Sequence, residues 1–167
     1  GGGGLDLGMA MIIEEELDRY HLATPPYYDT GGRLGSASIM VWGTDEQKEF
    51  FLPKILKGAV RTWQLPSEPE SGSDLASVST EAYRDGDEYV VTGAKVWTTK
   101  APYCDVCLLL VRTTPKELCD GPTQGMTLLL VDLQDPAVDI TPIPKVGRNA
   151  VVSCEVRYDG LRVPVSR

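Results

Sequence analysis

The sequence predicts an α+β protein, in which an N-terminal α-helical segment is followed by an antiparallel β-barrel or β-sandwich. Three observations predict this class. Apolar residues recur at helical spacing up to about residue 58. Beyond that point, short segments of strand-forming residues alternate with turn signals. Hydrophobic residues make up 42% and charged residues 24%, a globular composition that allows a buried core. We therefore expect a helical part over residues 1–58 and a β domain over residues 59–167.

Three helices are expected in the helical part. The first has apolar residues three or four positions apart and acidic residues opposite them, so we expect an amphipathic helix with one buried face. Its apolar positions are Met9, Ile12, Ile13, Leu17 and Tyr20. Residues 23–32 contain paired prolines and paired glycines, which favour a loop. A second helix is expected over residues 34–42, ending at Gly43.

The third helix is expected to begin after Thr44. Gln47 stands three residues later, which is the spacing of a capping box. Gly58 can end this helix because glycine tolerates the left-handed conformation of a C-cap. Pro53 falls inside the segment and is expected to kink or split the helix, because proline lacks an N–H donor.

Seven short strands are expected in the β domain. Asp85-Gly86 between two strand-like segments predicts a hairpin, because this dipeptide tolerates positive φ. Gly93-Ala94 is expected to turn the chain again. The expected strands are residues 79–83, 89–92, 95–99, 106–112, 126–133, 138–141 and 151–158. Short strands separated by turns are typical of a small barrel or sandwich.

Charge and composition exclude several classes of function. The 167 residues include 16 basic and 24 acidic ones, giving a net charge of −8, which argues against nucleic-acid binding. A single histidine excludes metal sites built on several histidines, and we predict no metal site. The chain has no apolar run of about 20 residues and no signal peptide at its start, so we expect a soluble intracellular protein with no membrane span.

The four cysteines are expected to be small core thiols in a reducing compartment. Cys104 and Cys107 form a C-x-x-C, while Cys119 and Cys154 stand apart. A redox pair needs a strand-to-helix turn at this motif, and zinc needs a second ligand pair at similar spacing. The apolar residues after Cys107 instead predict a buried strand. A metal or redox role is the less favoured alternative.

The segment over residues 64–74, QLPSEPESGSD, carries the most chemical information. Backbone N–H groups near Gly72, with the Ser71 and Ser73 hydroxyls, could hold an anion. The alternative is a solvated turn, since Ser, Gly, Pro and Asp are ordinary loop residues. The glycine-rich signatures of Rossmann and P-loop phosphate sites are absent from the sequence.

A second segment, residues 93–99 with sequence GAKVWTT, strengthens the functional interpretation. Together, residues 67–74 (SEPESGSD) and 95–99 (KVWTT) resemble the two flavin-holding motifs of the acyl-CoA dehydrogenase family. Residues 47–53 (QKEFFLP), 111–113 (VRT) and 162–164 (RVP) resemble further landmarks of that family, in the same order. The resemblance implies that residues 1–58 are the C-terminal part of an N-terminal helical domain. Residues 59–167 would be the middle β domain, with the C-terminal helical domain absent.

The resemblance also implies which residues bind the cofactor, FAD. Ser67 would contact the pyrimidine edge of the flavin, Trp97 would pack against the isoalloxazine, and Thr99 would hydrogen-bond near N5. Ser73 would lie near the FAD pyrophosphate and the acyl-CoA thioester. The full set of candidate cofactor-binding residues is Gln64, Ser67, Glu68, Gly72, Ser73, Trp97, Thr98 and Thr99. The alternative is that Trp97 is a core aromatic and Thr99 an ordinary strand residue.

Two nearby positions bear on this site. Pro66 has no N–H group, so it cannot donate to the flavin where relatives often make such a contact. Ser79 stands at the start of an expected strand, and we expect its replacement to be close to neutral, in contrast to that of Ser73.

The activity implied by the resemblance is FAD-dependent α,β-dehydrogenation of an acyl-CoA thioester, with electrons passed to an electron-transferring flavoprotein. The family's catalytic base is a Glu on the C-terminal helical domain, so we predict no catalytic residue in this chain. The complete protein is expected to be a homodimer or homotetramer, in the bacterial cytoplasm or the mitochondrial matrix of a eukaryote. Two alternatives are an oxygen-reactive relative, namely an acyl-CoA oxidase or flavin monooxygenase, and a non-catalytic binding subunit.

Overall fold

The computed structural model describes residues 4–22 and 34–167, which form two compact units, Gly1–Ala59 and Val60–Arg167. The first unit contains the helices α1 (Leu7–Arg19), α2 (Ser36–Trp42) and α3 (Asp45–Leu56). The second contains the strands β1 (Thr62–Leu65), β2 (Glu81–Asp85), β3 (Glu88–Thr99), β4 (Val106–Arg112), β5 (Met126–Asp132), β6 (Val138–Pro142) and β7 (Ser153–Pro164). The expected loop over residues 23–32 lies outside the described residues.

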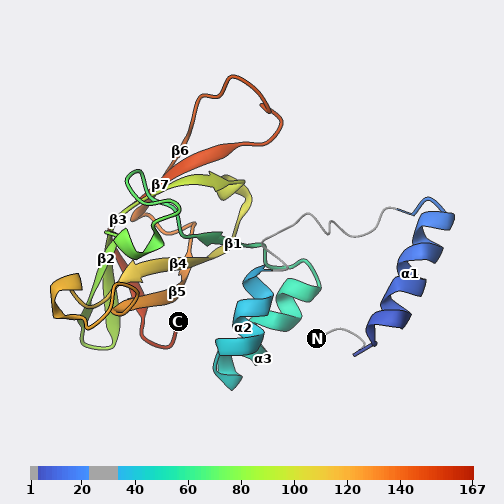
Figure 1. Ribbon diagram of the computed structural model, residues 1–167, viewed down its shortest axis with the longest axis horizontal. Coiled ribbons are helices and arrows are strands. Elements are labelled where there is room, and N and C mark those ends of the chain that lie inside the picture. Colours follow the sequence, from blue (N-terminus) through green and yellow to red (C-terminus); the bar gives the residue numbers. More distant parts are fainter. Residues whose placement is uncertain (1–3, 23–33) are drawn as a thin grey trace. The chain divides into compact units, whose positions relative to one another are not determined.

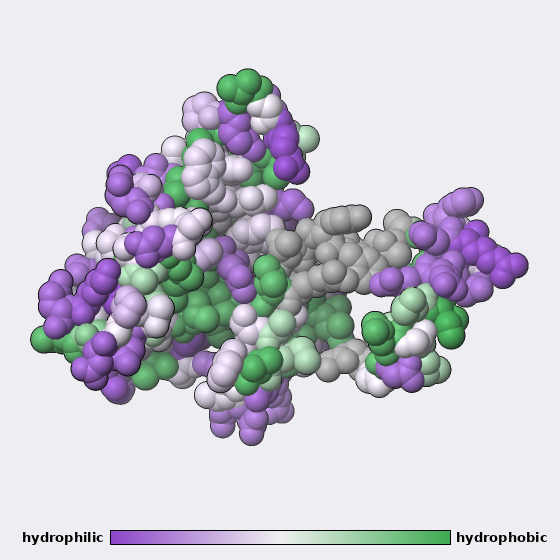
Figure 2. Space-filling model, in the orientation of Figure 1, coloured by the Kyte–Doolittle hydropathy of each residue, from purple (hydrophilic) through white to green (hydrophobic). Residues whose placement is uncertain are grey.

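Asp6 caps the N-terminal end of helix α1, and its carboxylate accepts a hydrogen bond of 2.9 Å from the Met9 N–H. The prediction of one buried face was wrong for this chain, because no residue of α1 is buried. Ile12 is 60% exposed, and apolar surface is visible on this helix in Figure 2. The helical periodicity therefore predicted the helix correctly, but not the burial of its apolar side.

Helix α3 has the predicted capping box. The Thr44 hydroxyl accepts from the Gln47 N–H at 3.2 Å, and the Gln47 side chain accepts from the Thr44 N–H at 3.0 Å. The helix is not split at Pro53, since it continues to Leu56. Proline removes one N–H donor and crowds the carbonyl four residues before it, and the three residues after Pro53 complete the helix. Within this unit, Ile39 of α2 and Phe51 of α3 are buried.

The β unit is one curled, seven-stranded sheet, a half-barrel in which Figure 1 shows the long strands β3 and β7 side by side. The strand order is β1-β4-β2-β3-β7-β6, and β5 pairs with the other edge of β4. The sheet is mixed and not purely antiparallel as expected, because β1 runs parallel to β4 and β2 makes a parallel bridge to it. The sequence prediction missed β1, whose four residues show no clear alternation.

The predicted turn at Gly93-Ala94 is absent, and one continuous strand, β3, replaces two expected strands. Gly93 has φ +150°, and a Cβ atom there would lie 2.7 Å from the Cα of Thr80. Glycine is therefore needed for the close approach of two backbone segments, which is its other common role in a strand. The Asp85–Glu88 hairpin is as predicted, with Gly86 at φ +63°.

The core of the β unit lies inside the curl of the sheet and includes three of the cysteines. Cys104, Cys107 and Cys154 are buried and Cys119 is half-buried, and all four are free thiols. Burial, with Cys104 and Asp132 nearby, raises the pKa of the Cys107 thiol well above its usual range, which suits a packing role. Among residues 4–22 and 34–167, no group of three or more potential metal ligands is found.

Within the described parts of the chain, no helix combines the length and the apolar character that a bilayer span requires.

Candidate functional site

The segment over residues 66–74 forms an ordered loop between β1 and a short 3₁₀ helix, Leu75–Ser77. It is closed by two backbone hydrogen bonds between Glu68 and Ser71, of 2.7 and 3.2 Å. The Ser71 hydroxyl donates to the Asp74 carbonyl at 2.7 Å, and Ser71 is only 1% exposed. Ser71 therefore stabilises the loop internally and is not the free anion donor that the sequence suggested.

The Glu68 carboxylate anchors this loop to the sheet. One oxygen accepts from the Lys95 ammonium at 2.8 Å and the Thr80 N–H at 2.9 Å. The other accepts from both the N–H and the hydroxyl of Ser79, each at 2.7 Å. Burial alone would raise the pKa of Glu68, but the hydrogen bonds from Lys95, Thr80 and Ser79 outweigh it and lower the pKa to about 2. The side chain of Glu68 thus faces the protein interior and is an anion at neutral pH.

Strand β3 meets the loop at the residue before Trp97. The Val96 N–H donates to the Ser67 carbonyl at 2.9 Å, so that the two segments singled out by the sequence lie together. At the same point the pairing of β3 with β7 shifts between Lys95 and Thr98, leaving two residues as a β-bulge.

Trp97 occupies this bulge in the left-handed region, with φ +61°, and is 61% exposed. The alternative that Trp97 is a core aromatic is therefore wrong. A bulky residue at positive φ costs about 1–3 kcal/mol and persists only where its surroundings hold it. Such strain clusters at functional sites, which makes the exposed indole the most informative feature of this surface.

The other candidate residues differ in accessibility. Ser67 and Thr99 are half-buried, and Gly72 and Ser73 are exposed. The hydrogen bonds that fold the loop use neither the N–H groups of Gly72 and Ser73 nor the Ser73 hydroxyl, so these groups can meet a ligand. Gln64 is half-buried in β1.

Thr98 differs from its neighbours Trp97 and Thr99. It is only 2% exposed and pairs directly with Cys154 of β7. Among the described residues, its hydroxyl is one of two buried side-chain oxygens with no hydrogen-bond partner. This burial separates Thr98 from the surface on which Trp97 is exposed, so a role in contact with a ligand is less well supported for Thr98 than for Thr99.

Sequence reasoning missed the residues that hold the loop in place. Ser79 was expected to be neutral, yet it donates twice to Glu68. Arg112 holds the segment that follows the loop, because its guanidinium donates to the carbonyls of Ala76 at 2.9 Å, Val78 at 3.1 Å and Gln124 at 2.9 Å. The available signal was a charged residue within one apolar strand, at Lys95, and another at the end of an apolar strand, at Arg112.

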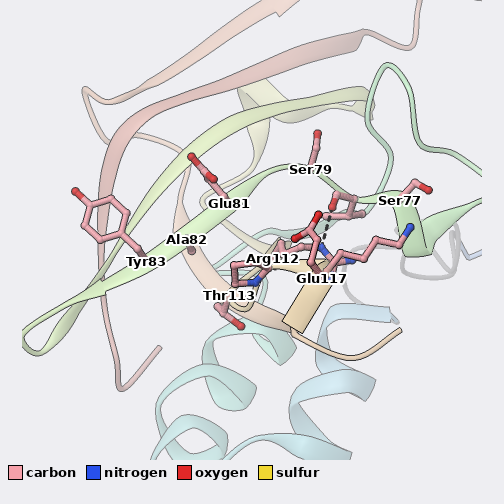
Figure 3. Close-up of a pocket in the computed structure, with 11 residues that line it drawn as sticks. Ser77, Ser79, Glu81, Ala82, Tyr83, Arg112, Thr113 and Glu117 are labelled. Carbon is pink, nitrogen blue, oxygen red and sulfur yellow. Dashed lines mark hydrogen bonds between the residues drawn. The ribbon is translucent and has the colours of Figure 1, made fainter. Parts of the chain in front are cut away.

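A cleft of about 550 Å³ lies beside the end of the loop (Figure 3). It is lined by residues 77–79 and 81–83 on one side and by Arg112, Thr113 and residues 115–117 on the other. None of the eight candidate residues lines it. The Arg112 side chain, whose bond to Val78 is drawn in Figure 3, is committed to backbone carbonyls, so we assign no chemistry to this cleft.

Two family descriptions match nearly the whole chain. The acyl-CoA dehydrogenase N-terminal domain matches residues 1–59, and the acyl-CoA dehydrogenase middle domain matches residues 65–161. Acyl-CoA dehydrogenase FadE26 of Mycobacterium tuberculosis is 40% identical over 129 residues, which cover 77% of this chain and 32% of the relative. The chain spans about a third of the length of the curated relatives it matches most strongly.

Solved structures give the same match in three dimensions. The ChsE4–ChsE5 complex of Mycobacterium tuberculosis is 36% identical, with a TM-score of 0.80 over 99% of this chain and 41% of that chain. A glutaryl-CoA dehydrogenase of Mycobacterium smegmatis in complex with FADH2 is 29% identical, with a TM-score of 0.68 over 79% of this chain and 32% of that chain.

Proposed function

The chain belongs to the acyl-CoA dehydrogenase family, and from this premise we propose that its β unit forms one wall of a FAD site. The complete protein would dehydrogenate an acyl-CoA thioester between its α and β carbons. Family membership supports flavin chemistry in general, and the geometry around Trp97 carries the proposal for this chain.

The residues around Trp97 fit a flavin. An isoalloxazine ring is planar and apolar on its faces, with polar groups along its edges. An exposed indole offers an apolar surface to such a ring. The backbone conformation at Trp97, with its positive φ, sets the direction in which the side chain leaves the strand. Ser67 and Thr99 nearby are half-buried residues, and their hydroxyls would bond to the polar edge. This combination of an apolar surface with adjacent donors is what a bound flavin requires.

The exposed end of the loop is assigned to oxygen atoms of the two ligands, which are charged in the FAD pyrophosphate and neutral in the thioester. The uncommitted N–H groups of Gly72 and Ser73, with the Ser73 hydroxyl, would donate to the FAD pyrophosphate and to the thioester end of acyl-CoA. Consecutive backbone N–H groups favour anions. A bond from a neutral donor to a charged oxygen contributes more than one between neutral groups.

FAD, when bound, supplies the acceptor for the hydride that leaves the β carbon of the substrate. The removal of the α proton needs a carboxylate of raised pKa in contact with the substrate. Glu68 is unsuited to this task because it is 4% exposed and its pKa is about 2. The proposal places the base on a residue outside this chain, as the family resemblance implies, and passes the electrons to an electron-transferring flavoprotein. A homo-oligomer remains part of the proposal.

The proposal is tested on the complete gene product. We expect it to retain FAD and to lose visible flavin absorbance when acyl-CoA thioesters are added without oxygen. Trp97→Ala should weaken FAD retention, whereas Tyr83→Ala, which removes an equally exposed aromatic from β2, should not. A wild-type protein that binds no FAD, or equal retention by both variants, would refute the proposal. Rapid reoxidation of the reduced flavin in air would instead identify an oxidase.

A further inference from the structure

The ion pair between Glu68 and Lys95 is almost completely buried, and anchoring the loop to the sheet does not by itself require a buried pair of charges. The two side chains are 2% and 0% exposed, and their charged atoms lie 2.8 Å apart. Lysine is almost never fully buried without a partner. Apolar residues of similar volume often replace such pairs with no loss of stability. A role in stability alone therefore does not account for the pair.

The pair joins three separate segments of the chain. Glu68 bonds to Ser79 and Thr80, the two residues directly before β2. Lys95 bonds to Glu68 and also to the Pro66 carbonyl, at 3.3 Å. The carbonyl between them, that of Ser67, accepts from Val96. Three consecutive loop residues are thus held by two consecutive residues of β3.

This arrangement explains the bulge at Trp97. The Val96 N–H bonds to the loop and not to β7, so the regular pairing of β3 with β7 fails between Lys95 and Thr98. Trp97 is left in the left-handed region that tryptophan ordinarily avoids. If the loop moved away, Val96 would be free to pair with β7, and the bulge could relax into a regular strand.

We propose that Glu68 and Lys95 are positioning residues, whose buried ion pair holds Ser67 against Val96 and thereby keeps Trp97 exposed on the bulge. The importance of this position for cofactor binding rests on the proposed function. The arrangement itself does not, because it follows from hydrogen bonds within this chain.

The main test is the double variant Glu68→Gln with Lys95→Met, which removes both charges and keeps similar volumes. Hydrogen–deuterium exchange of the full chain would be followed at the N–H groups of Ser79, Thr80 and Val96. We expect exchange there to rise at least about tenfold, while the amides that pair β4 with β5 keep their protection. In the complete gene product, FAD affinity should fall by at least about tenfold. Unchanged exchange at Val96, or an equal rise across all strands, would overturn the proposal.

A milder variant decides the matter if the double variant does not fold. Ser79→Ala removes one donor to Glu68 at an exposed position and should raise exchange at Val96 by a few-fold. Ser73→Ala is the matched control for exchange, since the folded loop does not use its hydroxyl, and it should leave Val96 unchanged. Equal exchange at Val96 in these two variants would overturn the proposal. If the wild-type protein binds no flavin while the variants show the expected changes in exchange, the proposed function is refuted and the role of the Glu68–Lys95 pair in positioning still holds.

Discussion

Replacing Gly93 with alanine tests the close approach on which the shape of β3 depends. The new Cβ would lie 2.7 Å from the Thr80 Cα and 2.7–2.8 Å from two atoms of its side chain, well inside ordinary contact. Thr80 cannot easily move, because its N–H bonds to Glu68 at 2.9 Å and its carbonyl accepts from the Arg112 N–H at 2.7 Å. Overpacking of this kind costs about 1–3 kcal/mol, and φ +150° adds about 1–3 kcal/mol for any residue with a Cβ.

We therefore expect Gly93→Ala to lower the free energy of unfolding by about 2–6 kcal/mol, a large part of a typical domain's stability. Urea unfolding followed by circular dichroism measures this change. In a separate thermal unfolding experiment, Tm should fall by at least about 8 °C. Gly147→Ala is the control, because nothing lies within 4 Å of its new Cβ, and it should stay within about 0.5 kcal/mol of wild type. A Gly93→Ala protein as stable as the control would show that β3 and Thr80 are not in close contact.

Three further predictions follow from the anchors of the loop and the bulge. The Trp97→Gly protein should be more stable than the Trp97→Ala protein by about 1 kcal/mol in urea unfolding, because only glycine is unstrained at this φ. The reverse order, which is normal for a strand, would show that the backbone at Trp97 is not strained. Glu68 has a lower pKa in the folded state, so its stabilisation is present above about pH 4.5 and is lost as the pH falls towards 2. The stability difference between wild type and the Glu68→Gln, Lys95→Met double variant should change by up to about 3 kcal/mol over this range, and a constant difference would contradict the assignment. In Arg112→Lys, the new ammonium cannot bond to three carbonyls at once, so the free energy of unfolding should fall by about 1.5–3 kcal/mol in urea unfolding. The exposed control Arg84→Lys should lower it by less than about 0.5 kcal/mol. Equal effects of the two substitutions would show that the bonds from Arg112 to the carbonyls contribute nothing.

Local signals in the sequence predicted the parts of the fold that depend on local contacts. The Thr44 capping box and the Asp85-Gly86 hairpin each involve residues within a few positions of one another, and both are found. Strand β4 has the predicted bounds because its apolar run is bounded by polar residues on both sides. Strand β1 was missed because its pairing with β4 lies more than 40 residues away and leaves no periodicity of its own.

The candidate site shows the same division. The motifs at residues 67–74 and 95–99 identified two segments that the structure joins through Val96 and Ser67. The bulge could not be predicted, since it depends on a loop carbonyl almost 30 residues away. Gly93 was misjudged for a related reason: glycine signals either a turn or a close approach, and only the position of Thr80 decides between them.

The pairing of β3 with β7 has a consequence for how the chain is made. These strands share the most extensive pairing in the sheet, yet their partners lie roughly 60 residues apart in the sequence. At a synthesis rate of about 5–20 residues per second, the edge of β3 that pairs with β7 stays unpaired for roughly 3–12 seconds during synthesis, until β7 has been made. During this time the β2–β3 hairpin exposes unpaired N–H and C=O groups, to which a second nascent chain can bind. Yield in a cell should therefore depend on chaperones and on expression rate more strongly than the stability of the finished sheet suggests.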